Sequence, residues 1–182
     1  RQHGHGLRAT HDGILVGIGT VLADDPSLTC RVAAASDPRP IVVDTDLRIP
    51  ATAKVFSHPL RPVIVCAVDA PERVLDADLL RVRRAEHGVD LRAALEGLVS
   101  MGLHRILAEG GASVHRSLLD SQLVDTLYVY IAGLLIPGGR SWISGPALED
   151  LRLGRRLPSP TVETLGSDIL LQYRLNTVRD GE

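Results

Sequence analysis

Aromatic residues are scarce in this sequence of 182 residues, at 3% of the total. A surface that stacks the bases of single-stranded nucleic acid on aromatic rings is therefore not expected. An excess of basic residues is absent too: the formal net charge is −2, which argues against nucleic acid or an anionic membrane as the main partner. No apolar run is long enough to cross a bilayer, and there is no signal-peptide pattern. We expect no nucleic-acid partner and no membrane partner.

Cysteine is also rare, with only Cys30 and Cys66 in the chain. Both lie within apolar runs, which indicates reduced core thiols in a cytoplasmic protein rather than a disulfide. Three histidines, His3, His5 and His11, lie near one another, but no acidic residue or cysteine accompanies them at a spacing typical of a metal site. We therefore predict no bound metal.

The remaining composition is that of an ordinary globular domain. Hydrophobic residues make up 45% of the chain and charged residues 23%. A chain of this length buries a substantial core, and residues 1–182 are predicted to form a single domain. Short apolar runs bounded by glycine, proline or an acid predict buried strands. These runs are 13–17, 40–44, 61–68, 106–108 and 127–135.

Helices are predicted between several of these strands. Residues 90–101 form the clearest one, because Asp90 is a good N-cap, Gly102 ends the helix, and apolar residues recur at offsets of three and four. A shorter helical turn is expected at 21–26. It follows a strand end that we expect at Ile18–Thr20.

The end of the chain predicts a β-hairpin, in which Thr161–Leu165 pairs with Ile169–Leu175 across a glycine-containing turn. Residues 71–84 fit either a helix or an edge strand at Leu79–Val82, and the sequence does not decide between them. Strands and helices alternate before the hairpin. The predicted fold class is therefore three-layer α/β, with a mainly parallel central sheet and an antiparallel C-terminal hairpin.

Glycines, hydroxyls and acids gather at three predicted strand ends, Gly17–Thr20, Asp44–Thr45 and Glu109–Ser113. At the third, Gly110 and Gly111 turn directly into a helix. Glycine lets the backbone approach a ligand closely, and a helix start offers unpaired N–H groups and a partial positive charge. The carboxyl ends of parallel strands share one edge of the sheet, which predicts a crevice for a nucleotide or cofactor. For the glycine pair alone, a tight turn without a ligand is the alternative.

Five segments of the chain carry a more distinctive pattern, namely 7–31, 40–50, 109–115, 123–132 and 165–171. Together they resemble the reductase domain of riboflavin biosynthesis, in both its bifunctional deaminase-reductase form and its stand-alone form. The resemblance implies a dihydrofolate reductase-like fold and the cofactor NADPH. It also implies that a phosphoribosylamino-pyrimidine is reduced to its ribitylamino form, so that the partner is a small phosphorylated pyrimidine. A homodimer is the assembly that the resemblance implies.

The resemblance also assigns roles to individual positions. Substrate contacts are implied for Arg8, Leu28, Arg31 and Glu109. Cofactor contacts are implied for Gly17, Thr20, Asp24, Thr45, Gly111, Ala112, Ser113, Val114 and His115, of which the last five would hold the phosphates. Glu109 and Asp24 are the acids expected to supply a proton, with bound water as the alternative.

One feature of the resembling family is missing from the sequence. Its members begin with a strand that lies centrally in the sheet and forms part of the substrate and nicotinamide pocket, and residues 1–182 are expected to lack it. The sequence leaves open whether a longer chain supplies that strand. Two alternatives to the reductase also stay open: a reductase of a pteridine-like or folate-like substrate, and a non-catalytic dimer. Neither the choice between NADPH and NADH nor that between amino-uracil and diamino-pyrimidinone substrates follows from the sequence.

Overall fold

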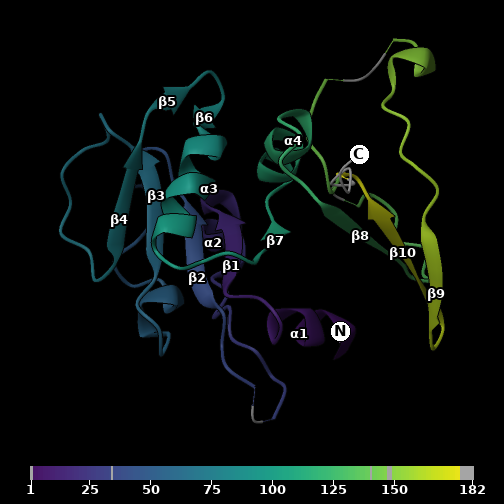
Figure 1. Cartoon of the computed structure of the whole chain (residues 1–182), viewed down its shortest axis with the longest axis horizontal. Coiled ribbons are helices and arrows are strands. Elements are labelled where there is room, and N and C mark those ends of the chain that lie inside the picture. The colour runs from purple at the N-terminus through teal and green to yellow at the C-terminus, as the bar shows by residue number, and fades with distance from the viewer. Residues whose placement is uncertain (1, 34, 140, 147–148, 177–182) are drawn as a thin grey trace, which may run out of the picture.

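The computed structural model describes residues 2–33, 35–139, 141–146 and 149–176. Its backbone forms two main sheets (Figure 1). The larger sheet has five parallel strands in the order β4-β3-β2-β1-β7. These strands are β1 (Gly13–Gly17), β2 (Arg39–Val43), β3 (Val63–Ala67), β4 (Asp78–Val82) and β7 (Ile106–Gly110).

The smaller sheet has three antiparallel strands in the order β8-β10-β9. Its strands are β8 (Thr126–Ile131), β9 (Thr161–Leu165) and β10 (Asp168–Arg174), and the predicted hairpin between β9 and β10 is confirmed. Gly166 takes a positive φ of 67° in the turn, a conformation that glycine adopts without strain. A separate two-stranded ribbon joins β5 (Arg84–Ala85) to β6 (Gly88–Val89).

The core lies in the parallel sheet. Ile14, Ile41 and Ile64, one from each of β1, β2 and β3, are 0% exposed. Such continuous apolar strands are typical of a parallel sheet with both faces covered. Helix α3 (Leu91–Ser100) packs against β4, and the predicted N-cap is confirmed because the Asp90 side chain accepts a hydrogen bond from the backbone N–H of Ala93. The other helices are α1 (Gln2–Arg8), α2 (Ile18–Asp24), α4 (Ala112–Asp120), and the 3-10 turns η1 (Lys54–Ser57) and η2 (Leu151–Leu153).

The expected strand end at Ile18–Thr20 is wrong, because helix α2 begins at Ile18 directly after β1. Gly17 has extended dihedrals and serves as the N-cap residue. Ile18 and Val21 are both buried. Their separation of three positions places both on the inner side of a helix, whereas in a strand they would face opposite ways.

The undecided segment 71–84 contains an edge strand, β4, which pairs in parallel with β3. Leu79 and Leu80 both pack against the core. Neighbouring strand residues point to opposite faces, so this pair contacts apolar residues on both sides of the sheet.

Strand β8 departs from the prediction in two ways. It ends at Ile131 instead of continuing to Leu135, and it does not join the parallel sheet. The chain crosses over from β7 through α4 to β8, as a parallel unit would, but among the described residues β8 pairs only with β10. Within the same residues β7 pairs only with β1, so each of the two strands keeps one edge without a ladder there. These strands lie on either side of the space that separates the sheets in Figure 1.

Among the residues that the structure describes, no helix is long and apolar enough to cross a lipid bilayer.

Candidate active site

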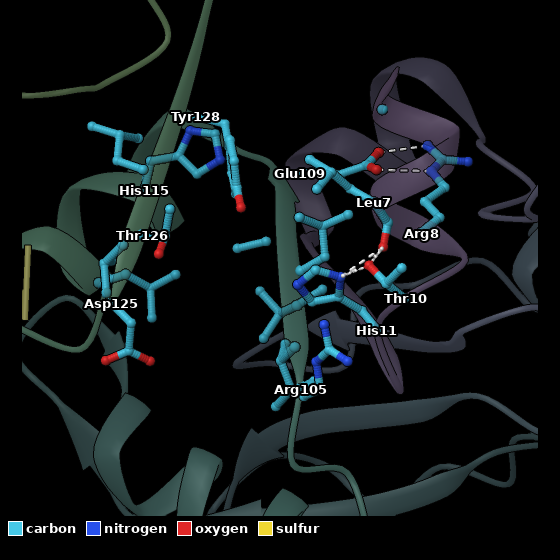
Figure 2. A pocket seen from close by; sticks show the side chains of 18 of the residues that line it. Leu7, Arg8, Thr10, His11, Arg105, Glu109, His115, Asp125, Thr126 and Tyr128 are labelled. Atoms are coloured by element: carbon cyan, nitrogen blue, oxygen red, sulfur yellow. Dashed lines mark hydrogen bonds and ion pairs between the residues drawn. The ribbon is translucent and has the colours of Figure 1, made fainter. Parts of the chain in front are cut away.

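A cavity of about 1280 Å³ lies between the two sheets. Its walls come from α1, β7 and β8, together with the loop that follows α2 and with α4 (Figure 2). The side chains in Figure 2 form two groups, one on β8 and α4 and the other on α1 and β7. The cavity is therefore bounded on opposite sides by β7 and β8, each of which has a single strand partner among the described residues.

Arg8 and Glu109 form the central ion pair of this cavity. Arg8 Nε donates to Glu109 Oε1 at 2.8 Å, and Arg8 Nη2 donates to Oε2 at 2.5 Å. Arg8 Nη1 also donates to the carbonyl oxygen of Thr29 at 2.7 Å. The hydrogen bond with Glu109 raises the pKa of Arg8, although partial burial acts in the opposite direction. A bidentate pair of this kind holds both side chains in a defined orientation, and α1 is thereby fastened to β7.

All the residues predicted to bind substrate line this one cavity, from three separate parts of the chain: Arg8, Leu28, Arg31 and Glu109. Leu28 is only 3% exposed and has a positive φ of 55°. A non-glycine residue in that conformation is uncommon, and here it belongs to the turn that brings Arg31 to the cavity. The structure thus gathers these side chains as a substrate site requires, while their contact with a substrate stays a prediction.

The predicted cofactor residues converge at the carboxyl end of β1 and β7. A Cβ atom on Gly17 would come within 2.9 Å of Val114 Cγ2, and one on Gly110 would come within 2.9 Å of Thr20 Oγ1. Gly111 has a φ of 97°, and a Cβ there would lie 3.5 Å from the backbone nitrogen of Gly17. The absence of side chains at these glycines lets the two strand ends lie close together, with Gly17 and Gly110 buried and Gly111 partly exposed.

Helix α4 begins directly after this cluster, with Gly111 as an N-cap that offers no side chain to bond the first turn. The amides of Ala112, Ser113 and Val114 belong to that turn and have no intrahelical acceptor. Free amides and the positive end of the helix dipole suit a phosphate group. The glycine cluster and the helix start therefore fit the phosphate groups of a nucleotide.

The other predicted cofactor residues are less clearly placed. His115 lines the cavity, and its Nδ1 lies 2.9 Å from the carbonyl oxygen of Trp142. Thr45 follows β2 at the carboxyl edge of the sheet, where its carbonyl oxygen accepts a hydrogen bond from the backbone of Ala67. Asp24 is exposed at the end of α2 and does not line the cavity. For Asp24 and Thr45 a contact with the cofactor stays a prediction.

Two tyrosines near the site were not singled out from the sequence, and His3 was considered there only as a metal ligand. Tyr128 and Tyr130 are two positions apart on β8, so they share a face, and both line the cavity. The hydroxyl of Tyr130 lies 2.7 Å from His3 Nδ1 on α1. The spacing of the tyrosines was visible in the sequence, but nothing there indicated which face of β8 would meet the cavity.

Metal binding finds no support in the described part of the chain, which contains no group of three or more histidine, cysteine or acidic side chains that could hold an ion.

Comparison with known proteins places the chain in a family. The model of the RibD C-terminal domain matches residues 1–171. The chain belongs to the RibD C-terminal domain family. A relative from Methanothermobacter thermautotrophicus, named 2,5-diamino-6-ribosylamino-4(3H)-pyrimidinone 5′-phosphate reductase, is 39% identical over 181 residues. The alignment covers 93% of this chain and 82% of that protein.

Longer members of the RibD family are matched over only part of their length. The riboflavin biosynthesis protein RibD of Actinobacillus pleuropneumoniae is 33% identical, with 91% of this chain and 46% of that protein covered. The chain therefore spans about half the length of this RibD relative.

Solved structures confirm the fold class. The riboflavin biosynthesis reductase Rib7 of Saccharomyces cerevisiae has a TM-score of 0.80 at 28% identity, over 96% of this chain and 80% of that one. The deaminase/reductase of Thermotoga maritima has a TM-score of 0.80 at 24% identity, over 97% of this chain and 48% of that one, and so supports the fold alone. The expected α/β fold of the dihydrofolate reductase type is shared with these proteins.

Proposed function

We propose that the chain is a reductase of riboflavin biosynthesis that reduces the ribosylamino group of a pyrimidine 5′-phosphate to a ribitylamino group. The observation that carries this proposal is the 39% identity to a pyrimidinone phosphate reductase across 93% of the chain. The cavity contains groups suited to such a substrate. Arg31 and the remaining N–H groups of Arg8 are available to a phosphate, and Glu109 can accept from sugar hydroxyls.

The preferred substrate is 2,5-diamino-6-ribosylamino-4(3H)-pyrimidinone 5′-phosphate. The relative with that name is matched over 82% of its length, whereas the RibD relative is matched over 46%. The amino-uracil is the second candidate. Competition between the two pyrimidines in one reaction distinguishes them, and faster consumption of the amino-uracil would reverse the assignment.

The cofactor in this proposal is NADPH, which would supply the hydride for the carbon that joins sugar to amine. The amides of Ala112 to Val114 would hold its diphosphate, beside Gly17 and Gly111. The protein's contribution is to keep the cavity dry and to align the sugar carbon with the nicotinamide position. Titration of NADPH and NADH, followed by the shift in melting temperature, tests the preference, and an equal shift with both would contradict it.

A further strand would complete the site. Both β7 and β8 have an edge without a ladder, and both line the cavity. Edges of this kind bind an additional strand through backbone hydrogen bonds. We therefore propose that these two edges accept an additional strand. Hydrogen exchange of the β7 and β8 amides in the full natural polypeptide tests this, since amides that exchange freely on the inner edges would exclude a strand there.

A second copy of the chain is the proposed partner for the outer face of the smaller sheet. The pairing registers place Ile131 opposite Ile169, and Val162 opposite Leu171, all on the face away from the tyrosines. Ile131, Val162 and Ile169 are 47%, 62% and 41% exposed. A homodimer would cover this apolar face. Light scattering of the wild type and of Ile169→Asp checks it, with a dimer expected for the first and a monomer for the second.

The direct test of the function is turnover of the pyrimidine phosphate with NADPH, followed by the loss of absorbance of the reduced nicotinamide. Dihydrofolate serves as the control substrate, since its faster turnover would favour a folate-like reductase. We also expect the protein to be cytoplasmic, with Cys30 and Cys66 as reduced thiols. Failure of the full natural polypeptide to oxidise NADPH with either pyrimidine would sink the proposal.

A further inference from the structure

The hydroxyl group of Tyr130 in the cavity is engaged by a side chain from the opposite wall. The phenol of Tyr130 lies 2.7 Å from Nδ1 of His3, and their rings meet edge to face with centroids 5.8 Å apart. Tyr130 comes from β8 and His3 from α1, so this contact joins the two sides of the cavity. Tyr130 and Glu109 both line the cavity.

Glu109, the acid expected to donate a proton, is poorly arranged for that task. Both of its carboxylate oxygens accept hydrogen bonds from Arg8. An oxygen that accepts an N–H in this way carries no proton to give. Asp24, the other expected donor, does not line the cavity. Other protic side chains line the cavity, among them Asp125 and His115, and Tyr130 is one that a side chain from the opposite wall holds by its hydroxyl.

We propose that Tyr130 is the proton donor that opens the sugar ring of the substrate, with His3 as the positioning residue that restores its proton. This inference rests on the proposed function. The substrate holds its ribose as a closed ring in which one carbon bears both the ring oxygen and the amine. That carbon can accept a hydride only after the ring has opened.

The proposed step is balanced without a redox change. The bond between the anomeric carbon and the ring oxygen breaks, and its electron pair stays on the oxygen. The lone pair of the amine nitrogen forms a carbon–nitrogen double bond, which leaves an iminium ion. The oxygen takes the proton of Tyr130, and the phenolate that remains is reprotonated through His3 from solvent.

The surroundings of Tyr130 keep the phenol protonated until it is used. Partial burial raises the pKa of Tyr130, and the nearby Glu109 and Tyr128 add to that effect. The ionisable groups that face it are thus Glu109 of β7, Tyr128 of β8 and His3 of α1. A donor must be protonated, so ring opening is expected to persist at neutral pH and to fall as the solution becomes alkaline.

Ring opening can be measured without any cofactor, because a ring that opens and closes exchanges its two anomers. Exchange NMR of the pyrimidine phosphate with the full natural polypeptide is expected to show faster exchange than in buffer. Tyr130→Phe is expected to slow the enzyme-dependent exchange about 100-fold, the lower range for loss of a general acid. Tyr173→Phe, on the neighbouring strand β10 and outside the residues that line the cavity, is the matched control and is expected to behave as the wild type.

His3→Ala supplies a second measurement that a merely structural role would not move. The exchange rate is expected to fall, and added imidazole is expected to restore part of it, while the substrate dissociation constant stays near the wild-type value. Equal exchange in the wild type and Tyr130→Phe would overturn the proposal. So would reduction by a wild type that does not accelerate exchange, although the proposed function would then stand. Accelerated exchange without reduction would instead count against the proposed function alone.

Discussion

The two sheets of this protein differ in how much of their surface is covered. In β1, β2 and β3 nearly every side chain is buried, and Ile14, Ile41 and Ile64 are fully inaccessible. In the smaller sheet only Leu170 is buried, at 2% exposure. The strands at the centre of the parallel sheet are thus covered on both faces, whereas the smaller sheet has an exposed apolar face and an unpaired edge. The candidate site lies between the two sheets.

This difference explains where binding residues occur. A fully buried strand such as β1 has no side chain available to a ligand, whereas β7 is only partly buried and presents the exposed Glu109 near its end. The smaller sheet leaves whole faces accessible, so Tyr128 and Tyr130 can reach the cavity from the middle of β8. The parallel sheet holds its site residues in a packed framework, and the smaller sheet forms the opposite wall of the cavity.

Removal of matched isoleucines tests the contrast most directly. Ile41→Ala, in β2, is expected to lower the free energy of unfolding by about 4 kcal/mol, because it leaves a cavity in a packed core. Ile169→Ala, in β10, where the side chain is 41% exposed in the single chain, is expected to lower that of the dissociated monomer by about 1 kcal/mol or less. Urea unfolding of dilute protein, at which the proposed dimer is dissociated, measures both. A large cost at Ile169 under these conditions would contradict the contrast between the two sheets.

The ion pair between Arg8 and Glu109 connects helix α1 to strand β7. Arg8→Lys keeps the charge but loses the bidentate hydrogen bonds with Glu109, and kcat/KM is expected to fall about 100-fold, equivalent to about 3 kcal/mol. Steady-state kinetics with the pyrimidine phosphate measures it. Arg83→Lys is the control, because Arg83 pairs with Asp90 but is 80% exposed. A comparable fall in kcat/KM in both variants would refute a special role for the ion pair between Arg8 and Glu109.

Substitution of Gly111, at the start of α4, tests the proposed cofactor site. Gly111→Ala places a Cβ at a φ of 97°, close to Gly17, and is expected to weaken NADPH binding about tenfold or more. Gly102→Ala is the control, since Gly102 also has a positive φ, of 83°, but open space around its Cβ position. Calorimetric titration of each variant gives the dissociation constants. If both variants bind NADPH equally well, the glycine cluster is not a cofactor cradle.

The smallest effect is expected at Asp90, the N-cap of α3, which packs against the parallel sheet and does not itself line the cavity. Asp90→Ala is expected to cost about 1 kcal/mol at neutral pH without change in activity. The hydrogen bond from Ala93 and then that from Arg83 lower the pKa of Asp90 in the folded protein. A lowered folded-state pKa contributes stability above the unfolded pKa of about 3.9, and this is lost as the pH falls through the folded value.

Urea titrations of the wild type and Asp90→Ala at neutral and acidic pH check this prediction. The difference between the two proteins should shrink with acidification below about pH 4. A difference that grows in acid would show that the sign is wrong.

Local features of the sequence determined a large part of the fold. The buried strands β1, β2 and β3 follow from short apolar runs, α3 from Asp90 and its apolar stripe, and the hairpin from Gly166. Each of these depends on interactions between residues close together in the chain. The resemblance of several segments to a reductase family was likewise legible in the sequence, and it supplied the candidate site residues.

Only the tertiary structure decided the remainder. Ile18 starts a helix and not a strand end, because its partner in the core is Val21. Arg8 and Glu109 are 101 positions apart, and His3 and Tyr130 are 127 apart, so no local pattern could pair them. The separation of β8 from the parallel sheet depends on its hydrogen bonding to β10, which lies far away in the sequence. Contacts between residues so far apart in the chain are set by how the helices and strands pack together. Local sequence patterns therefore do not predict them.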